Sequence, residues 1–128
     1  MFIRFVIEDL DADSGRRQGL FQAAETLLTN GRVPSHDAHY LEELYAWFKV
    51  HLPVPDRFAA SSRPHAKAQA LSWFRGTATQ HIRQMREYQR LLEEAGLRVS
   101  VLRTERPGYV VFEDEYQVVA YPFAETPT

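Results

Sequence analysis

The hydrophobic pattern of the chain changes its period twice, and this change constrains the fold more than any other feature. Residues 2–7 (FIRFVI) are β-branched and aromatic, and they are apolar on both faces of a strand except at Arg4. A strand that is apolar on both faces is typical of the inside of a sheet. We therefore expect residues 2–7 to pair with strands from a distant part of the chain, because a lone strand leaves its backbone unpaired.

The middle of the chain repeats apolar side chains at helical spacing. This pattern predicts helices over residues 16–30 and 36–52, with Ser35 as the N-cap of the second. It continues over residues 63–95, where Gly76-Thr77 divides it into two helices or one kinked helix. Trp73 and Phe74 are the expected apolar anchors of the first half of that segment.

The last third of the chain returns to a period of two. Residues 98–104, 109–112 and 117–121 are expected to be short strands of an antiparallel meander, with a turn at Pro107-Gly108. The predicted order is β-α-α-α(α)-β-β-β. The sequence therefore predicts a single α+β domain over residues 1–128, with helices packed on one face of a four-stranded, mostly antiparallel sheet.

Composition excludes several classes of function. The 128 residues are 45% apolar and 25% charged, which is ordinary for one globular domain, and the absence of cysteine excludes disulfides and thiolate chemistry. No apolar run is long enough to cross a membrane and the N-terminus lacks a secretory pattern, so we expect a cytoplasmic protein without membrane contact. Phosphate-binding and dinucleotide-binding glycine motifs are missing, so no cofactor is expected.

Charge is distributed unevenly along the chain. Residues 57–90 hold 7 basic side chains and one acidic side chain, whereas both flanking regions are acidic. A basic helical face of this kind can contact nucleic-acid phosphates or an acidic partner, but it can equally be solvated or neutralised by the acidic flanks. The candidate binding residues on the predicted helices are Arg63, Lys67, Arg75, Arg83, Arg86 and Arg90.

Aromatic side chains are dense near residues 40–48 and 73–74. Trp47 lies off the apolar stripe of its predicted helix, so it is a candidate for an exposed contact with a partner. Tyr40 and Trp73 are candidates for the same interface. The alternative is that Trp47 packs against the neighbouring helices.

Histidines and carboxylates offer weaker candidates for a catalytic or metal site. His36 and His39 lie three residues apart on a predicted helix and could share a metal ion, although no third ligand is evident. A composite catalytic site would bring these two residues together with His81 and Glu113. The acidic turn at 113–115 could bind a cation, or it could be the solvated tip of a hairpin.

Two segments resemble known sequences. Residues 70–75 (ALSWFR) and 106–120 (RPGYVVFEDEYQVVA) resemble a group of small, uncharacterised bacterial proteins of about this length. The resemblance implies a bacterial source and carries no activity to any residue.

Three functional hypotheses follow from the sequence. Because catalytic signatures are missing, the favoured hypothesis is a non-catalytic interaction or regulatory protein that binds a protein partner or a second copy of itself. The first alternative is a nucleic-acid-associated protein that uses the basic segment 63–90. The second is a small enzyme with a composite site of histidines and carboxylates.

Overall fold

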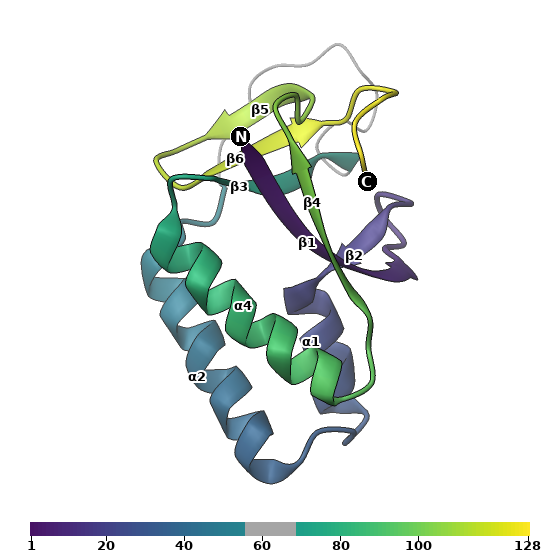
Figure 1. Ribbon diagram of the computed structural model, residues 1–128, viewed down its shortest axis with the longest axis vertical. Helices are drawn as coiled ribbons and strands as arrows, with labels where there is room; N and C mark the ends of the chain where they lie inside the picture. The colour runs from purple at the N-terminus through teal and green to yellow at the C-terminus, as the bar shows by residue number, and fades with distance from the viewer. Residues whose placement is uncertain (56–68) are drawn as a thin grey trace.

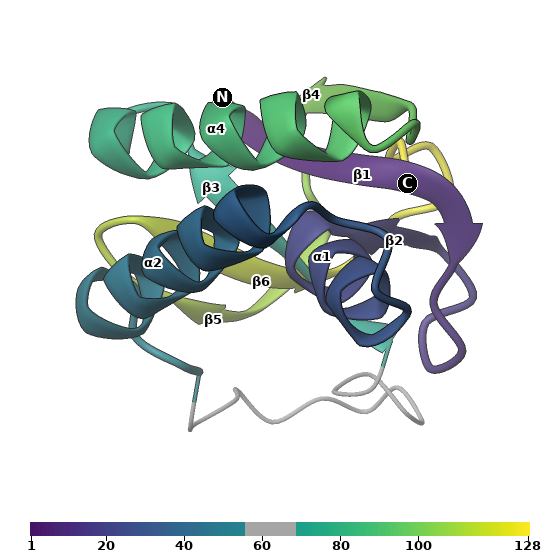
Figure 2. The same cartoon turned by 90° about the horizontal axis from the view of Figure 1, so that it is seen from below.

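The computed structural model describes residues 1–55 and 69–128. These residues form an α+β fold in which three helices lie together on one side of a six-stranded antiparallel sheet (Figures 1 and 2). The predicted class is confirmed, but the sheet has two more strands than predicted. The elements are β1 (Phe2–Leu10), β2 (Arg17–Gly19), α1 (Leu20–Thr29), α2 (Ser35–His51), β3 (Leu71–Arg75), α4 (Thr79–Glu94), β4 (Val99–Thr104), β5 (Tyr109–Glu113) and β6 (Gln117–Tyr121).

Strand β1 is the centre of the sheet, and one of its edges is forked. Strand β4 pairs with β1 along Phe2–Ile7. Ile3 also pairs with β3 and Val6 also pairs with β2, so both of these strands must lie on the edge opposite β4. Between them, Arg4 and Phe5 have no paired residue on that edge. In Figure 1, β3 meets the start of β1 and β2 meets its end, which leaves a fork in the sheet.

The two faces of β1 contribute to different parts of the interior. Ile3, Phe5 and Ile7 belong to the main core, which α1, α2 and α4 complete. Phe2 lies on the opposite face and packs against a smaller cluster that contains Trp73. This arrangement confirms that residues 2–7 form an internal strand, and it explains why nearly every side chain of the segment is apolar.

Residues 71–75 are a strand, which corrects the prediction that this segment is helical. Leu71 and Trp73 are buried while Ser72 between them is exposed, which is the alternation of a strand. Pairing with β1 and β6 decides the outcome, because a short aromatic segment carries no strong helical preference of its own. The first part of the predicted helix, residues 63–68, lies outside the described residues.

The other predicted helices hold with adjusted ends. The helix predicted over residues 16–30 begins only at Leu20, because residues 17–19 form strand β2 beside β1. Helix α2 matches the predicted range, but Pro34 and not Ser35 is its N-cap residue. Among the described residues, no helix combines the length and the apolar character needed to span a membrane.

The predicted meander is half correct. Strands β5 and β6 form the expected hairpin, but β4 pairs with β1 instead of β5. Gly108, which precedes β5, adopts a left-handed φ of 138°, and a Cβ atom there would collide with the Tyr121 carbonyl oxygen. The β5–β6 turn needs no glycine because the Asp114 carboxylate accepts hydrogen bonds from the backbone N–H groups of Tyr116 and Gln117.

Candidate functional site

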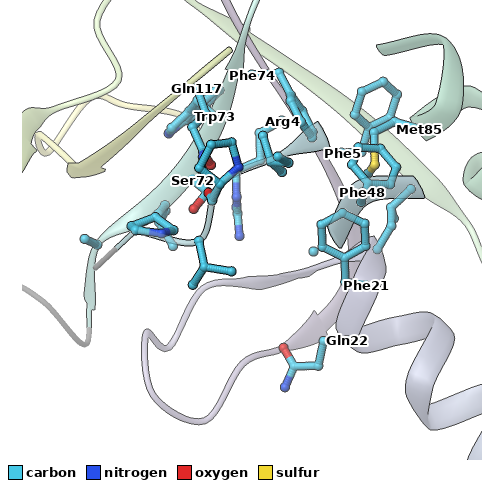
Figure 3. A pocket seen from close by; sticks show the side chains of 18 of the residues that line it. Arg4, Phe5, Phe21, Gln22, Phe48, Ser72, Trp73, Phe74, Met85 and Gln117 are labelled. Atoms are coloured by element: carbon cyan, nitrogen blue, oxygen red, sulfur yellow. Dashed lines mark hydrogen bonds between the residues drawn. The ribbon is translucent and has the colours of Figure 1, made fainter. Parts of the chain in front are cut away.

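A cavity of about 420 Å³ opens at the fork in the sheet. Its lining comes mainly from β1, β3, the start of α1 and the end of α2 with the residues that follow it, and α4 and β6 add Met85 and Gln117. The volume falls in the range of roughly 300–1,000 Å³ that is typical of sites for small molecules. Figure 3 shows Arg4 in the cavity, between the aromatic side chains of the helical core and the Trp73 side of the sheet.

Arg4 is the residue of this cavity that most needs an explanation. It is only 7% exposed, although arginine is almost never fully buried without a partner. Its Nη2 donates a hydrogen bond of 2.7 Å to the carbonyl oxygen of Arg17. Its Nη1 is buried and has no hydrogen-bond partner in the described part of the chain. The guanidinium therefore lines an apolar cavity with one donor group unused.

The electrostatic surroundings of Arg4 do not offset its burial. Loss of hydration, together with the nearby Arg17 guanidinium, lowers the pKa of Arg4 to about 10, while Asp11 acts in the opposite direction. Within residues 1–55 and 69–128, no carboxylate forms an ion pair with Arg4, whereas Arg17 pairs with Glu8 at 3.7 Å. The side chain stays charged near neutral pH, so Arg4 is a buried cation without an ion-pair partner in the described part of the chain.

Trp73 also lines the cavity, and its side chain contains a second buried donor that is unused. Its side chain is 1% exposed, and its Nε1–H has no hydrogen-bond partner among the described residues. Phe2 on β1 pairs with Arg75 on β3, so these two side chains lie on the same face of the sheet. Arg4 and Trp73 are each two residues from that pair on their own strand, and side chains two residues apart share a face. Arg4 and Trp73 therefore lie on one face. Two buried donors with no acceptor thus face one region of the fold.

The remaining walls of the cavity are mainly apolar. Phe21 makes edge-to-face contacts with Phe48 and Tyr88, at ring-centroid distances of 5.0 and 5.4 Å. Phe5, Phe21 and Phe48 lie together in Figure 3 and form the wall opposite Trp73. This wall can hold an apolar or aromatic group of a ligand, while Arg4 offers a hydrogen bond to an acceptor.

Gln117 also lines the cavity, but its amide nitrogen is already engaged. Its Nε2 donates to the Pro53 carbonyl oxygen at 2.7 Å and to Asp114 Oδ2 at 3.1 Å. Since Asp114 also closes the hairpin turn, its carboxylate has a structural role there. The bond to Pro53 ties the end of α2 to the sheet beside the cavity.

The predicted basic face is dispersed in the structure. Arg75 lies on β3 and not on a helix, where it pairs with Glu113 at 3.1 Å. On α4, Arg90 pairs with Glu87 and Glu94, Arg86 bonds to Gln89, and Arg83 is exposed. Arg63 and Lys67 lie outside the described residues. The four described members of the predicted basic face thus separate into one on the sheet and three on α4.

Two of the three predicted interface aromatics pack between helices of the chain itself. The Tyr40 hydroxyl donates to Glu87 at 2.8 Å and so links α2 to α4. Trp47 is half-buried, stacks on His51 and meets the edge of His81. Trp73 lies in the interior, because it belongs to a strand and not to an exposed helix.

The candidate histidines do not converge. His36 and His39 are exposed near the start of α2 and pair with Asp37 and Glu43. His81 is buried and approaches the carbonyl oxygen of His51, which lies roughly 18 Å along the helix from His39. In the part of the chain that the structure describes, no three histidine, aspartate or glutamate side chains are grouped to hold a metal ion.

The sequence contained one signal for the cavity. Arg4 is the single exception in an otherwise apolar strand, and a buried strand position is costly for a charged side chain. Trp73 could not be assigned to the cavity because its segment was predicted to be helical. The fork itself depends on which strands pair with β1, and no local pattern encodes that choice.

Comparisons with known proteins add no relative. No protein-family description matches the chain, and neither a curated protein nor a solved structure resembles it significantly. The resemblance of residues 70–75 and 106–120 to small bacterial proteins therefore stays a prediction.

Proposed function

We propose that the protein is a non-catalytic binding protein whose cavity takes a small molecule with an apolar body and a carboxylate. The observation that carries this proposal is Arg4, a buried guanidinium with an unused Nη1 in an apolar cavity. Burial of an unpaired charge is expensive, and a bound anion would offset that cost. The cavity supplies room for the apolar part of the same molecule.

A single negative charge suits this site better than a double one. Arg4 is the only buried cation that lines the described cavity, and Lys49 at its border is exposed. A dianionic phosphate would bring more negative charge than the single Arg4 guanidinium can compensate in apolar surroundings. A carboxylate carries one charge and two acceptor oxygens, and the unused Arg4 Nη1 is a donor for such an oxygen.

Calorimetric titration with a matched pair of ligands tests the proposal. The probes are 3-phenylpropionate and the neutral 3-phenylpropan-1-ol, which have the same apolar body. We expect the acid to bind at least about tenfold more tightly than the alcohol, because a hydrogen bond to a charged group is worth roughly 1.5–3 kcal/mol. Equal affinities for the two compounds would refute the role of Arg4 as an anion receptor.

Two variants test whether binding of the acid depends on Arg4 itself or on the loss of any arginine near the sheet. Arg4→Met keeps a side chain of similar length without the charge, and we expect it to lose the preference for the acid. Arg103→Met removes an exposed arginine from β4, the strand paired with β1, and we expect it to bind like the unchanged protein. Circular dichroism of both variants checks that each one is folded.

The proposal leaves room for the partners predicted from the sequence. Association with a protein partner or with a second copy of the chain stays a prediction, and binding of nucleic acid by the arginines of α4 stays the alternative to it. Binding of a small carboxylate would give a regulatory protein of this kind a signal to respond to.

A further inference from the structure

Asp11 is a second charged residue that lines the cavity. It follows β1 directly, and the turn after the strand fixes its position. Its backbone N–H donates to the Arg16 carbonyl oxygen at 2.7 Å, and its Oδ2 accepts from the Ser14 N–H at 2.9 Å. The hydrogen bond from the Ser14 backbone is the main cause that lowers the pKa of Asp11, so the carboxylate is ionised near neutral pH.

Arg4 and Asp11 line the same cavity, yet they form no ion pair with each other. Here Asp11 is close enough to act on the charge of Arg4, while Arg4 Nη1 remains without an acceptor. Arg4 and Asp11 thus provide one cationic and one anionic group on the lining of the same cavity.

The charges of Arg4 and Asp11 also favour a ligand that carries both a negative and a positive group. With a bound carboxylate alone, Arg4 would be compensated and Asp11 would be left as an excess negative charge beside the ligand. A ligand with a carboxylate and an ammonium group leaves no excess charge on either side. The exposed Lys49 alters this balance little, because water screens its charge.

We propose that the ligand is a zwitterion, an amino acid with a large apolar side chain, whose carboxylate binds Arg4 and whose ammonium group binds Asp11. This inference rests on the proposed function and makes its ligand class specific. The apolar side chain lies against the wall that contains Phe21 and Phe48.

Three probes with one shared body test this inference by calorimetry. L-Phenylalanine carries both charges, 3-phenylpropionate lacks the ammonium group and 2-phenylethylamine lacks the carboxylate. We expect L-phenylalanine to bind roughly tenfold more tightly than 3-phenylpropionate, since it adds a charge-assisted hydrogen bond. We expect 2-phenylethylamine to bind most weakly, because it leaves Arg4 without an anion.

The variant Asp11→Asn assigns the ammonium group to Asp11. An asparagine keeps an oxygen that can accept from the Ser14 N–H, so the turn is retained. We expect the variant to lose the roughly tenfold preference for L-phenylalanine, and to bind 3-phenylpropionate at least as tightly as before. The exposed Asp13 lies in the same turn, and Asp13→Asn is the matched control that keeps the preference.

The possible results distinguish this inference from the proposed function. If 3-phenylpropionate binds as tightly as L-phenylalanine, the zwitterion is refuted and the carboxylate site stands. If Asp13→Asn loses the preference as fully as Asp11→Asn, the assignment to Asp11 is refuted. If neither acid binds to the unchanged protein, both proposals fail.

Discussion

The arginines of α4 and the single arginine of β1 carry the same charge in opposite surroundings. On α4, Arg90 lies between Glu87 and Glu94, and Arg86 bonds to Gln89 while it covers the ring of Phe5. These side chains reach water and have partners. Arg4 is buried, and one of its nitrogens has neither a partner in the described residues nor access to water. A charge that is costly to keep is a better pointer to function than a charge that costs little.

The free energies involved differ widely. An exposed ion pair on a helix contributes about 0–1 kcal/mol, so the arrangement on α4 needs no further explanation. For Arg4, burial and the nearby Arg17 lower the pKa from 12.5 to about 10, which corresponds to a cost on the order of 3 kcal/mol for keeping the charge. A domain of this size has only about 5–15 kcal/mol of net stability, so such a cost is substantial.

Removal of the buried charge should therefore stabilise the protein. We expect Arg4→Met to raise the free energy of unfolding by about 1–3 kcal/mol without ligand, because an apolar side chain fits this site at no cost in hydration. Arg86→Met should change it by less than about 0.5 kcal/mol, as is usual at exposed positions. Urea denaturation followed by circular dichroism measures both. A loss of stability in Arg4→Met would mean that its bond to the Arg17 carbonyl oxygen outweighs the burial cost.

Some elements of the fold can be predicted from local sequence, and others depend on pairing with distant parts of the chain. Helices α2 and α4 and the β5–β6 hairpin follow from periodicity, because in each case the local pattern agrees with the final packing. Strand β3 does not, because pairing with two distant strands decides its conformation.

The candidate site shows the same division. Arg4 can be noticed in the sequence as a charge in an apolar strand, but its lack of a partner depends on the positions of every carboxylate in the fold. The run of basic residues was more conspicuous, although its members on α4 and β3 turn out to be exposed or paired. Charge density along a sequence reveals neither burial nor pairing, and both determine what a charge costs.

Glu87 is a paired charge, and removal of its partner should lower the free energy of unfolding, whereas removal of the unpaired Arg4 should raise it. Glu87 accepts a hydrogen bond from the Tyr40 hydroxyl, and this bond, together with Arg90, holds the pKa of Glu87 below its ordinary value of 4.5. We expect Tyr40→Phe to lower the free energy of unfolding at neutral pH by about 0.5–1 kcal/mol, as for other partly exposed hydrogen bonds to charged groups.

The sign of the pH dependence follows from the lowered pKa of Glu87. The stabilisation is complete above pH 4.5 and is lost as the pH falls through the folded-state value, where Glu87 takes up a proton. The unchanged protein and Tyr40→Phe should therefore converge in stability in acid. Urea denaturation of both proteins between pH 3 and 7 measures the difference, and a difference that stays constant over this range would contradict the assignment.

The smallest expected effect is that of the α4 arginines on ligand binding. We expect Arg83→Glu with Arg86→Glu to change the affinity for 3-phenylpropionate by less than about threefold, because exposed charges are screened by water and salt. With Arg75 on the sheet and Arg90 paired, we also expect no retardation of a short DNA duplex in a gel at about 50 mM salt. If the unchanged protein retards the duplex, salt weakens the complex and the double substitution abolishes it, then α4 is a nucleic-acid surface. In that case both Arg4 and the arginines of α4 would bind anions. The buried Arg4 would bind a small one, and the exposed arginines would bind a large one.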